Sequence, residues 1–167
     1  MPALETLNKL LDVKRLRENQ ALRIMLAQRS AFEEAVTRQD AALQMLTAHQ
    51  QFAAQQESLM YGELCRRVVS LRDIEDVQGQ VRTMRTREFD HRKQLDVAQE
   101  DRERQEQQLT EDRVRHLAAL RARTKFVDVI DDFAGEARRE GERSEEAASE
   151  ETVESRYRGE SPLGDGA

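Results

Sequence analysis

Apolar residues recur along this chain at alternating spacings of three and four, the pattern of a helix that buries one narrow face. In the first segment the alternation runs through ten positions without a slip, and seven of them are apolar. These positions are Leu22, Met25, Arg29, Phe32, Val36, Gln39, Leu43, Leu46, Gln50 and Ala53. Sustained alternation favours a coiled-coil seam over an isolated amphipathic helix. The register shifts between Lys14 and Ala21, where we expect a local break in the packing.

A second segment carries a longer seam of the same kind, in which ten of seventeen positions are apolar. They are Val77, Val81, Met84, Glu88, His91, Leu95, Ala98, Arg102, Gln105, Leu109, Asp112, His116, Ala119, Arg123, Phe126, Ile130 and Phe133. Residues 89–111 are poor in large apolar side chains, and most helical stability in proteins comes from packing an apolar face. This helix therefore needs a partner, and the first segment is the nearest candidate.

A helix start signal separates the two segments. Ser70 precedes Asp73 by three residues, which is the spacing of a capping box. Gly62 competes with residues 66–69 as the point of reversal, although one glycine only weakens a helix. We predict an all-α, antiparallel two-helix coiled-coil hairpin, with a helix at about 4–65, a turn at about 66–70 and a helix at about 71–134. Facing residues then have numbers that add to about 136, and each arm is about 90 Å long.

The chain changes character after Phe133. Residues 127–167 hold 13 acids and 5 bases, whereas the preceding residues carry a small net positive charge. Two glycines, Gly135 and Gly141, interrupt the apolar pattern. We predict that residues 135–143 are a fraying helix and that the rest of 135–167 is a disordered acidic tail.

The composition favours a rod over an enclosed catalytic domain. Charged residues make up 36% of the 167 residues and aromatic residues 4%, a profile typical of coiled coils. No catalytic residues, cofactor site or metal site are predicted. The hairpin brings His49 and His91 within about one helical turn, but a metal site needs three or four converging ligands.

The sequence also indicates where the protein is located and whether nucleic acid is a favoured partner. No signal peptide or membrane span is indicated, and a single cysteine suits a reducing compartment, so we expect a cytoplasmic protein without direct membrane insertion. Residues 1–30 hold six bases against three acids, but no aromatic residue precedes Phe32, so nucleic-acid binding is not favoured.

Protein contacts are therefore the predicted chemistry, and we place them at the two ends of the hairpin. The candidate residues at the open end are Lys14, Arg15, Arg17, Phe126 and Ile130. Those at the turn are Arg66, Arg67 and Val69. A solvated helix face is the alternative interpretation of these charges.

Three islands of sequence resemble the YscO family of type III secretion proteins. Residues 10–18 (LLDVKRLRE) are similar to the family's first-helix start, and residues 63–85 to its mid-chain turn and second-helix start. Residues 123–127 (RTKFV) resemble its Lys-Phe element. The resemblance implies a non-enzymatic protein related in architecture to the flagellar export protein FliJ and to the central stalk of rotary ATPases.

The same resemblance implies partners and a location. Such a protein links the hexameric export ATPase to the cytoplasmic ring of the export gate, at the cytoplasmic base of the secretion apparatus, and some relatives bind export chaperones. The sequence leaves open which end meets which partner. A cytoplasmic chaperone or adaptor without an ATPase link is the alternative, and a homodimeric coiled-coil scaffold is a third.

Overall fold

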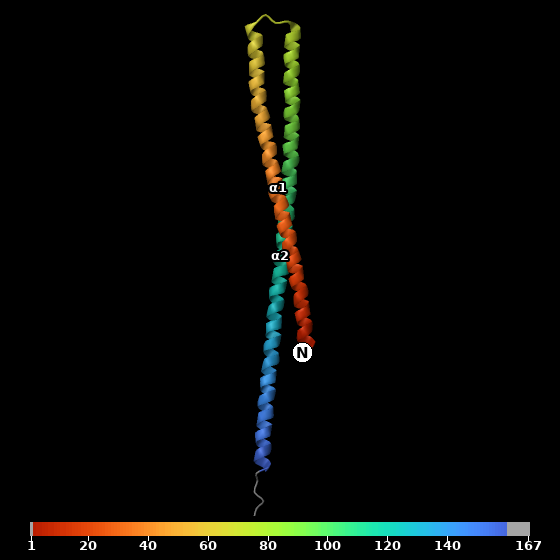
Figure 1. Cartoon of the computed structure of the whole chain (residues 1–167), viewed down its shortest axis with the longest axis vertical. Coiled ribbons are helices and arrows are strands. Elements are labelled where there is room, and N and C mark those ends of the chain that lie inside the picture. Colours follow the sequence, from red (N-terminus) through yellow and green to blue (C-terminus); the bar gives the residue numbers. More distant parts are fainter. Residues whose placement is uncertain (1, 160–167) are drawn as a thin grey trace, which may run out of the picture. The chain divides into compact units, whose positions relative to one another are not determined.

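The chain forms two long helices that pack antiparallel as a hairpin (Figure 1). The structure is a computed structural model and describes residues 2–159. Helix α1 spans Pro2–Arg66 and helix α2 spans Leu71–Gly159. This confirms the predicted fold class. Proline is absent between Pro2 and Pro162, so nothing removes a backbone donor from the interior of either helix.

The start of α2 is held by a reciprocal cap. The amide of Asp73 donates to Oγ of Ser70 at 3.3 Å, and the amide of Ser70 donates to Oδ2 of Asp73 at 3.0 Å. This is the predicted capping box. Gly62 lies inside α1, so the chain reverses at residues 67–70 and not at the glycine.

The hairpin divides into two compact units. The first holds the described residues up to Gln20 and from Leu117 onward, and the second holds Ala21–His116. Within the second unit, cross-helix pairs such as Gln28 with Gln105 and Glu57 with Arg85 have numbers that add to 133–142, close to the predicted value of about 136.

The seam of α2 follows the predicted register at every position. All seventeen predicted residues, from Val77 to Phe133, are buried or half-buried. The most deeply buried apolar ones are Val81, Met84, Leu109 and Ile130. The alternating spacing of three and four residues therefore predicts the packed face of α2 correctly, even at positions where that face carries polar residues.

Eight of the ten predicted seam positions of α1 are buried or half-buried, and two are not. Arg29 and Leu43 are exposed, and their neighbours Gln28 and Ala42 are half-buried instead. Ala35 is 0% exposed, which indicates a close approach of the two helices at this point. The prediction favoured the larger side chains, whereas a narrow gap accepts the small ones.

The expected shift of register near residue 14 is corrected by the structure. Buried and half-buried positions of α1 keep the alternating spacing of three and four from Leu4 to Met60 without a slip. Two of these positions, Lys14 and Glu18, are charged, and Glu18 is only 7% exposed. The apolar pattern is interrupted there because ionic side chains occupy the seam.

The C-terminal boundary is also corrected, since α2 continues through residues 135–159. This stretch is rich in Ala, Glu and Arg, which favour helix, and each glycine costs only about 1 kcal/mol. Residues 138–159 are all exposed. The last part of the predicted tail, 160–167, lies outside the described residues. Within 2–159, neither helix has a stretch apolar enough to span a membrane.

We predict that Ala35→Leu lowers the free energy of unfolding by about 1–3 kcal/mol, because the added atoms overpack a site with no free space. Ala41→Leu is the matched control, since Ala41 is exposed and the same substitution should change stability by less than about 0.5 kcal/mol. Urea unfolding followed by circular dichroism measures both variants. Equal effects at the two positions would contradict a tight contact at Ala35.

Candidate functional site

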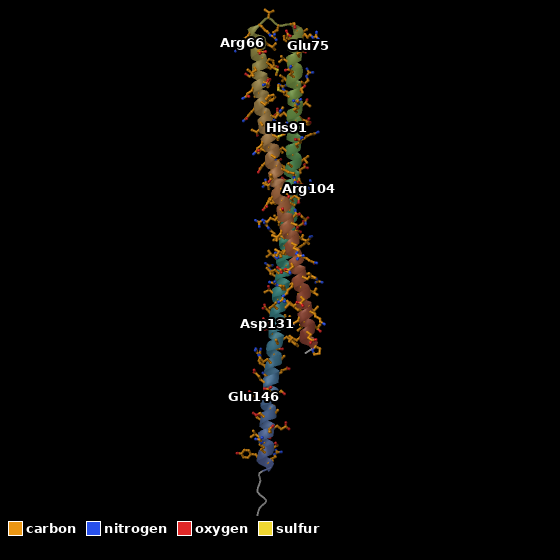
Figure 2. The ribbon with its side chains drawn as sticks, viewed as in Figure 1. Arg66, Glu75, His91, Arg104, Asp131 and Glu146 are labelled. Carbon is orange, nitrogen blue, oxygen red and sulfur yellow. The ribbon has the colours of Figure 1, made fainter. Side chains whose placement is uncertain are left out.

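The turn presents cationic and apolar side chains to solvent. Val68 is fully exposed and Leu71 is 72% exposed, although both are large apolar residues. Arg66 and Arg67 are exposed, and Val69 is half-buried. Figure 2 shows Arg66 at this end of the second unit. We call residues 66–69 with Leu71 the turn surface.

The capping box makes the start of α2 an electrostatically defined point. The backbone amide of Ser70, then its hydroxyl, hold the pKa of the Asp73 carboxyl below its ordinary value, and the nearby Arg67 guanidinium acts in the same direction. Asp73 is therefore ionised at neutral pH, at the positive end of the helix dipole. The cap fixes where α2 begins and so which residues project from the turn.

In the first unit, three of the predicted contact residues take part in packing between the helices. The Nζ atom of Lys14 lies 5.5 Å from the ring centroid of Phe126, a cation–π contact. Ile130 is buried, with 9% exposure. The seam residue Glu18 accepts a bond from Arg123 Nη1 at 3.4 Å. Lys14, Phe126 and Ile130 thus hold the two helices together.

Other side chains of α1 in the first unit are exposed to solvent. Leu10, Val13 and Leu16 are 47%, 44% and 58% exposed. Their spacing of three places them together on one side of the helix, where Arg17 is also exposed. Arg15 is exposed as well, and its Nη1 atom lies 3.7 Å from Oδ1 of Asp12. We call Leu10, Val13, Leu16 and Arg17 the terminal surface.

Polar side chains bridge the helices along the second unit. Nε2 of His49 donates to the backbone carbonyl of Met84 at 2.9 Å, since a carbonyl can only accept. Its ring lies 5.1 Å from that of His91, which confirms the predicted proximity of the two histidines. Arg38 pairs with Asp101 at 2.9 Å. These contacts fix how the helices face one another.

The bridging side chains of residues 2–159 do not form a metal site. No three His, Cys, Asp or Glu residues within 2–159 converge in a way that would hold a metal ion. The Glu88 carboxylate accepts bonds from Gln50 and Arg92, and these lower its pKa. Hydrogen-bond donors of α1 and α2 therefore stabilise the negative charge of Glu88.

The family of the chain follows from comparison with known proteins. The sequence model described as Type III secretion protein YscO matches residues 7–155, which is 149 of the 167 residues. The chain belongs to the YscO family of type III secretion proteins. No curated protein matches the sequence.

A solved structure supports the fold of this YscO family member. The crystal structure of type III secretion protein YscO from Vibrio parahaemolyticus is similar to it with a TM-score of 0.78. The match covers 90% of this chain and 94% of that chain at 18% sequence identity. The two chains share a fold, and this level of identity carries no residue roles from one to the other.

Sequence reasoning named Val69 at the turn but did not name Val68 and Leu71 there, or Leu10, Val13 and Leu16 on α1. At the turn, Val68 and Val69 are adjacent, and two successive residues of a short turn rarely both face inward. On α1, Leu10, Val13 and Leu16 lie beside the seam residues Leu7, Leu11 and Lys14. That second apolar stripe is the signal in the sequence that indicates an exposed apolar surface.

We predict that the pKa of Asp73 rises part of the way to its ordinary value in Ser70→Ala, because the hydroxyl bond is lost and the backbone amide bond remains. Since the folded pKa is depressed, the carboxylate stabilises the start of α2 above its unfolded pKa. The stabilisation by the Asp73 carboxylate is lost as the pH falls through the pKa that Asp73 has in the folded protein. Carbon-detected NMR titration of Asp73 measures the change.

The control is Ser58→Ala, an exposed serine in α1, which should leave the Asp73 titration unchanged. An Asp73 pKa that does not respond to Ser70→Ala would contradict the capping role of the hydroxyl.

Proposed function

We propose that this protein is a non-catalytic coupling component of a type III secretion apparatus, linking the hexameric export ATPase to the cytoplasmic ring of the export gate. The observation that carries the proposal is the family match over residues 7–155 in a chain folded as a helical hairpin. Two helices with a narrow seam enclose no reaction chamber, so their chemistry lies in what their surfaces contact. The proposed location is the cytoplasmic base of the apparatus.

The distribution of exposed apolar and cationic side chains supports two binding surfaces. The turn surface belongs to the second unit and the terminal surface to the first. Each combines large exposed apolar side chains with arginine, a residue type enriched at protein interfaces. Exposed apolar patches on soluble proteins mark interaction sites. Two such surfaces on one chain suit a protein that joins two partners.

The terminal surface is the proposed contact for the ATPase. Arg17 supplies its positive charge, and Leu10, Val13 and Leu16 its apolar area. Arg15, an exposed residue of the same helix that also lies near Asp12, adds to the proposed contact. Lys14, Phe126 and Ile130 act beneath it by holding α1 and α2 together. The turn surface, with Arg66, Arg67 and Val69, is the proposed contact for the gate ring.

The first test is the double variant Leu16→Ser/Arg17→Glu. It should weaken binding to the export ATPase roughly tenfold or more and reduce stimulation of ATP hydrolysis, because truncation of interface anchors typically costs more than 1 kcal/mol each. Circular dichroism should show unchanged helicity, since both residues are exposed.

The matched control is Leu117→Ser/Arg121→Glu, which makes the same two changes at exposed positions of α2 in the same unit. Equal losses in both double variants would refute the terminal surface. If wild-type protein binds secretion chaperones but no ATPase, the adaptor function replaces the proposed one.

The second test is Arg66→Glu/Arg67→Glu at the turn. This variant should lose affinity for the cytoplasmic domain of the export gate roughly tenfold while retaining ATPase stimulation, because charge reversal places acids where the proposed contact requires cations. Arg82→Glu/Arg113→Glu, at exposed positions of α2 in the same unit, is the control. Full gate binding by the turn variant would remove the turn surface from the proposal.

A further inference from the structure

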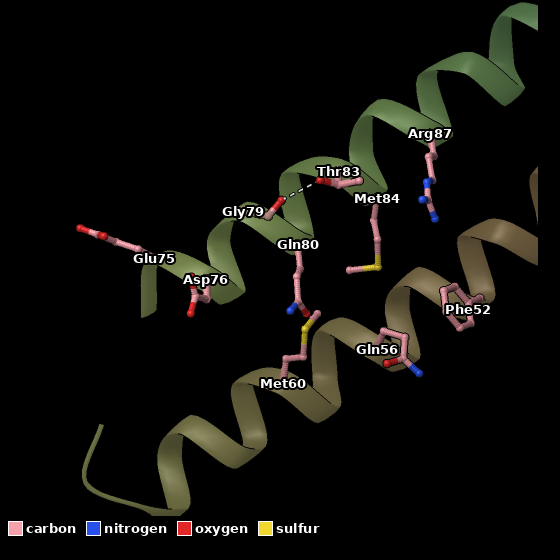
Figure 3. A pocket seen from close by; sticks show the side chains of 10 residues that line it. All are labelled: Phe52, Gln56, Met60, Glu75, Asp76, Gly79, Gln80, Thr83, Met84 and Arg87. Atoms are coloured by element: carbon pink, nitrogen blue, oxygen red, sulfur yellow. Dashed lines mark hydrogen bonds between the residues drawn. The ribbon is translucent and has the colours of Figure 1, made fainter. Parts of the chain in front are cut away.

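A groove runs between α1 and α2 in the second unit, close to the turn (Figure 3). Its volume is about 680 Å³. In Figure 3 the side chains of Met60, Gln80 and Met84 converge between the helices. The groove is open to solvent and runs along the two helices, so an extended segment of another protein can lie in it.

The groove has a mixed lining: six of its ten lining residues are polar or charged, and Phe52, Met60 and Met84 supply its apolar side chains, although Met84 is largely buried between the helices. Met60 and Met84 are unbranched and polarisable, and such side chains fit themselves to irregular partners. Phe52 lines the groove with 52% of its surface exposed, which is high for an aromatic residue. Gly79 lines it without a side chain, and a Cβ atom built there would meet nothing within 4 Å. The glycine therefore leaves space that any other residue would fill.

Acidic residues lie at one end of the groove, and a basic residue lies at the other end. Glu75 and Asp76 line it near the start of α2, and Arg87 lines it three turns further along. Within residues 2–159 none of the three takes part in an ion pair. Figure 3 shows Arg87 extending toward α1 beside Phe52. The distance along α2 from Glu75 to Arg87 is about 18 Å, the length of a helix of about 12 residues.

We propose that this groove binds a short amphipathic helix of a partner protein. Apolar side chains on one face of that helix would lie against Phe52, Met60 and Met84, with the closest approach at Gly79. A lysine or arginine at one end would meet Glu75 and Asp76, and an aspartate or glutamate at the other would meet Arg87. Recognition of this kind uses anchors about one turn apart.

Charge complementarity disfavours the acidic part of a second copy as the occupant. Residues 140–154 hold seven acids and one base, so they would bring like charge to Glu75 and Asp76. A partner helix with a basic end has no such conflict. The inference goes beyond the proposed function, because groove binding requires neither the ATPase nor the export gate.

The test uses a synthetic peptide of about 15 residues with leucine and methionine on one helical face, lysines at one end and glutamates at the other. It is added to the full chain carrying carbon-13 methionine methyl groups. The signals of Met60 and Met84 should shift on binding, with a dissociation constant on the order of 100 µM or tighter. Those of Met25 and Met45, which do not line the groove, should stay in place.

Gly79→Leu should weaken the peptide roughly tenfold by filling the groove, and it removes a helix glycine, so lost binding is not a result of unfolding. Gly62→Leu is the matched control, since that glycine also faces open space and does not line the groove. Glu75→Lys/Asp76→Lys should reject the peptide and accept one whose lysines are replaced by glutamates, with the glutamates that face Arg87 kept.

Peptide binding that leaves Met60 and Met84 unshifted, or that survives Gly79→Leu, overturns the proposal. The absence of binding at millimolar peptide does so as well. Signals of Met60 and Met84 that move with protein concentration alone would show that a second copy occupies the groove, and this also contradicts a partner helix.

Discussion

The structure depends on a narrow seam between two helices in which polar side chains form bonds from one helix to the other. Gln28 bonds to Gln105 across the pair, and His49 bonds to the backbone carbonyl of Met84. A slip of the helices would break these bonds between half-buried groups, and a bond of this kind typically contributes about 1 kcal/mol. Polar positions in a seam thus specify register, which a uniform apolar stripe would leave open. The small, fully buried Ala35 adds a steric requirement to the same alignment.

The sequence predicted the hairpin well where the rule of alternating spacing was sufficient. In α2 the register was correct even at Asp112, which is 2% exposed, because spacing and not apolarity was followed. In α1 the rule selected the exposed Leu43 in place of Ala42, since side-chain size suggested the larger residue. The distance between the two helices decides which of these two residues is buried. The sequence of one helix does not contain that distance. The ionic seam residue Glu18 was missed for the related reason that its partner Arg123 is 105 residues away.

The candidate surfaces arise from apolar residues that the narrow seam cannot cover. Leu16 stays exposed because each helix buries only one stripe, and Val68 stays exposed because it lies in the turn, outside both helices. The groove beside Gly79 has a different origin, since it needs residues of both helices held in one register. Spacing arguments applied to each helix separately cannot detect it, although the cap at Ser70 that helps to set the register was visible in the sequence.

The claim that this YscO family member couples two partners is tested most directly by asking whether it binds them at the same time. Mass photometry of the chain mixed with the export ATPase and the cytoplasmic gate domain measures this. The account predicts a three-component complex whose mass equals the sum of its parts and which is lost when the chain is omitted. Mutually exclusive binding, with either partner displacing the other, would contradict it.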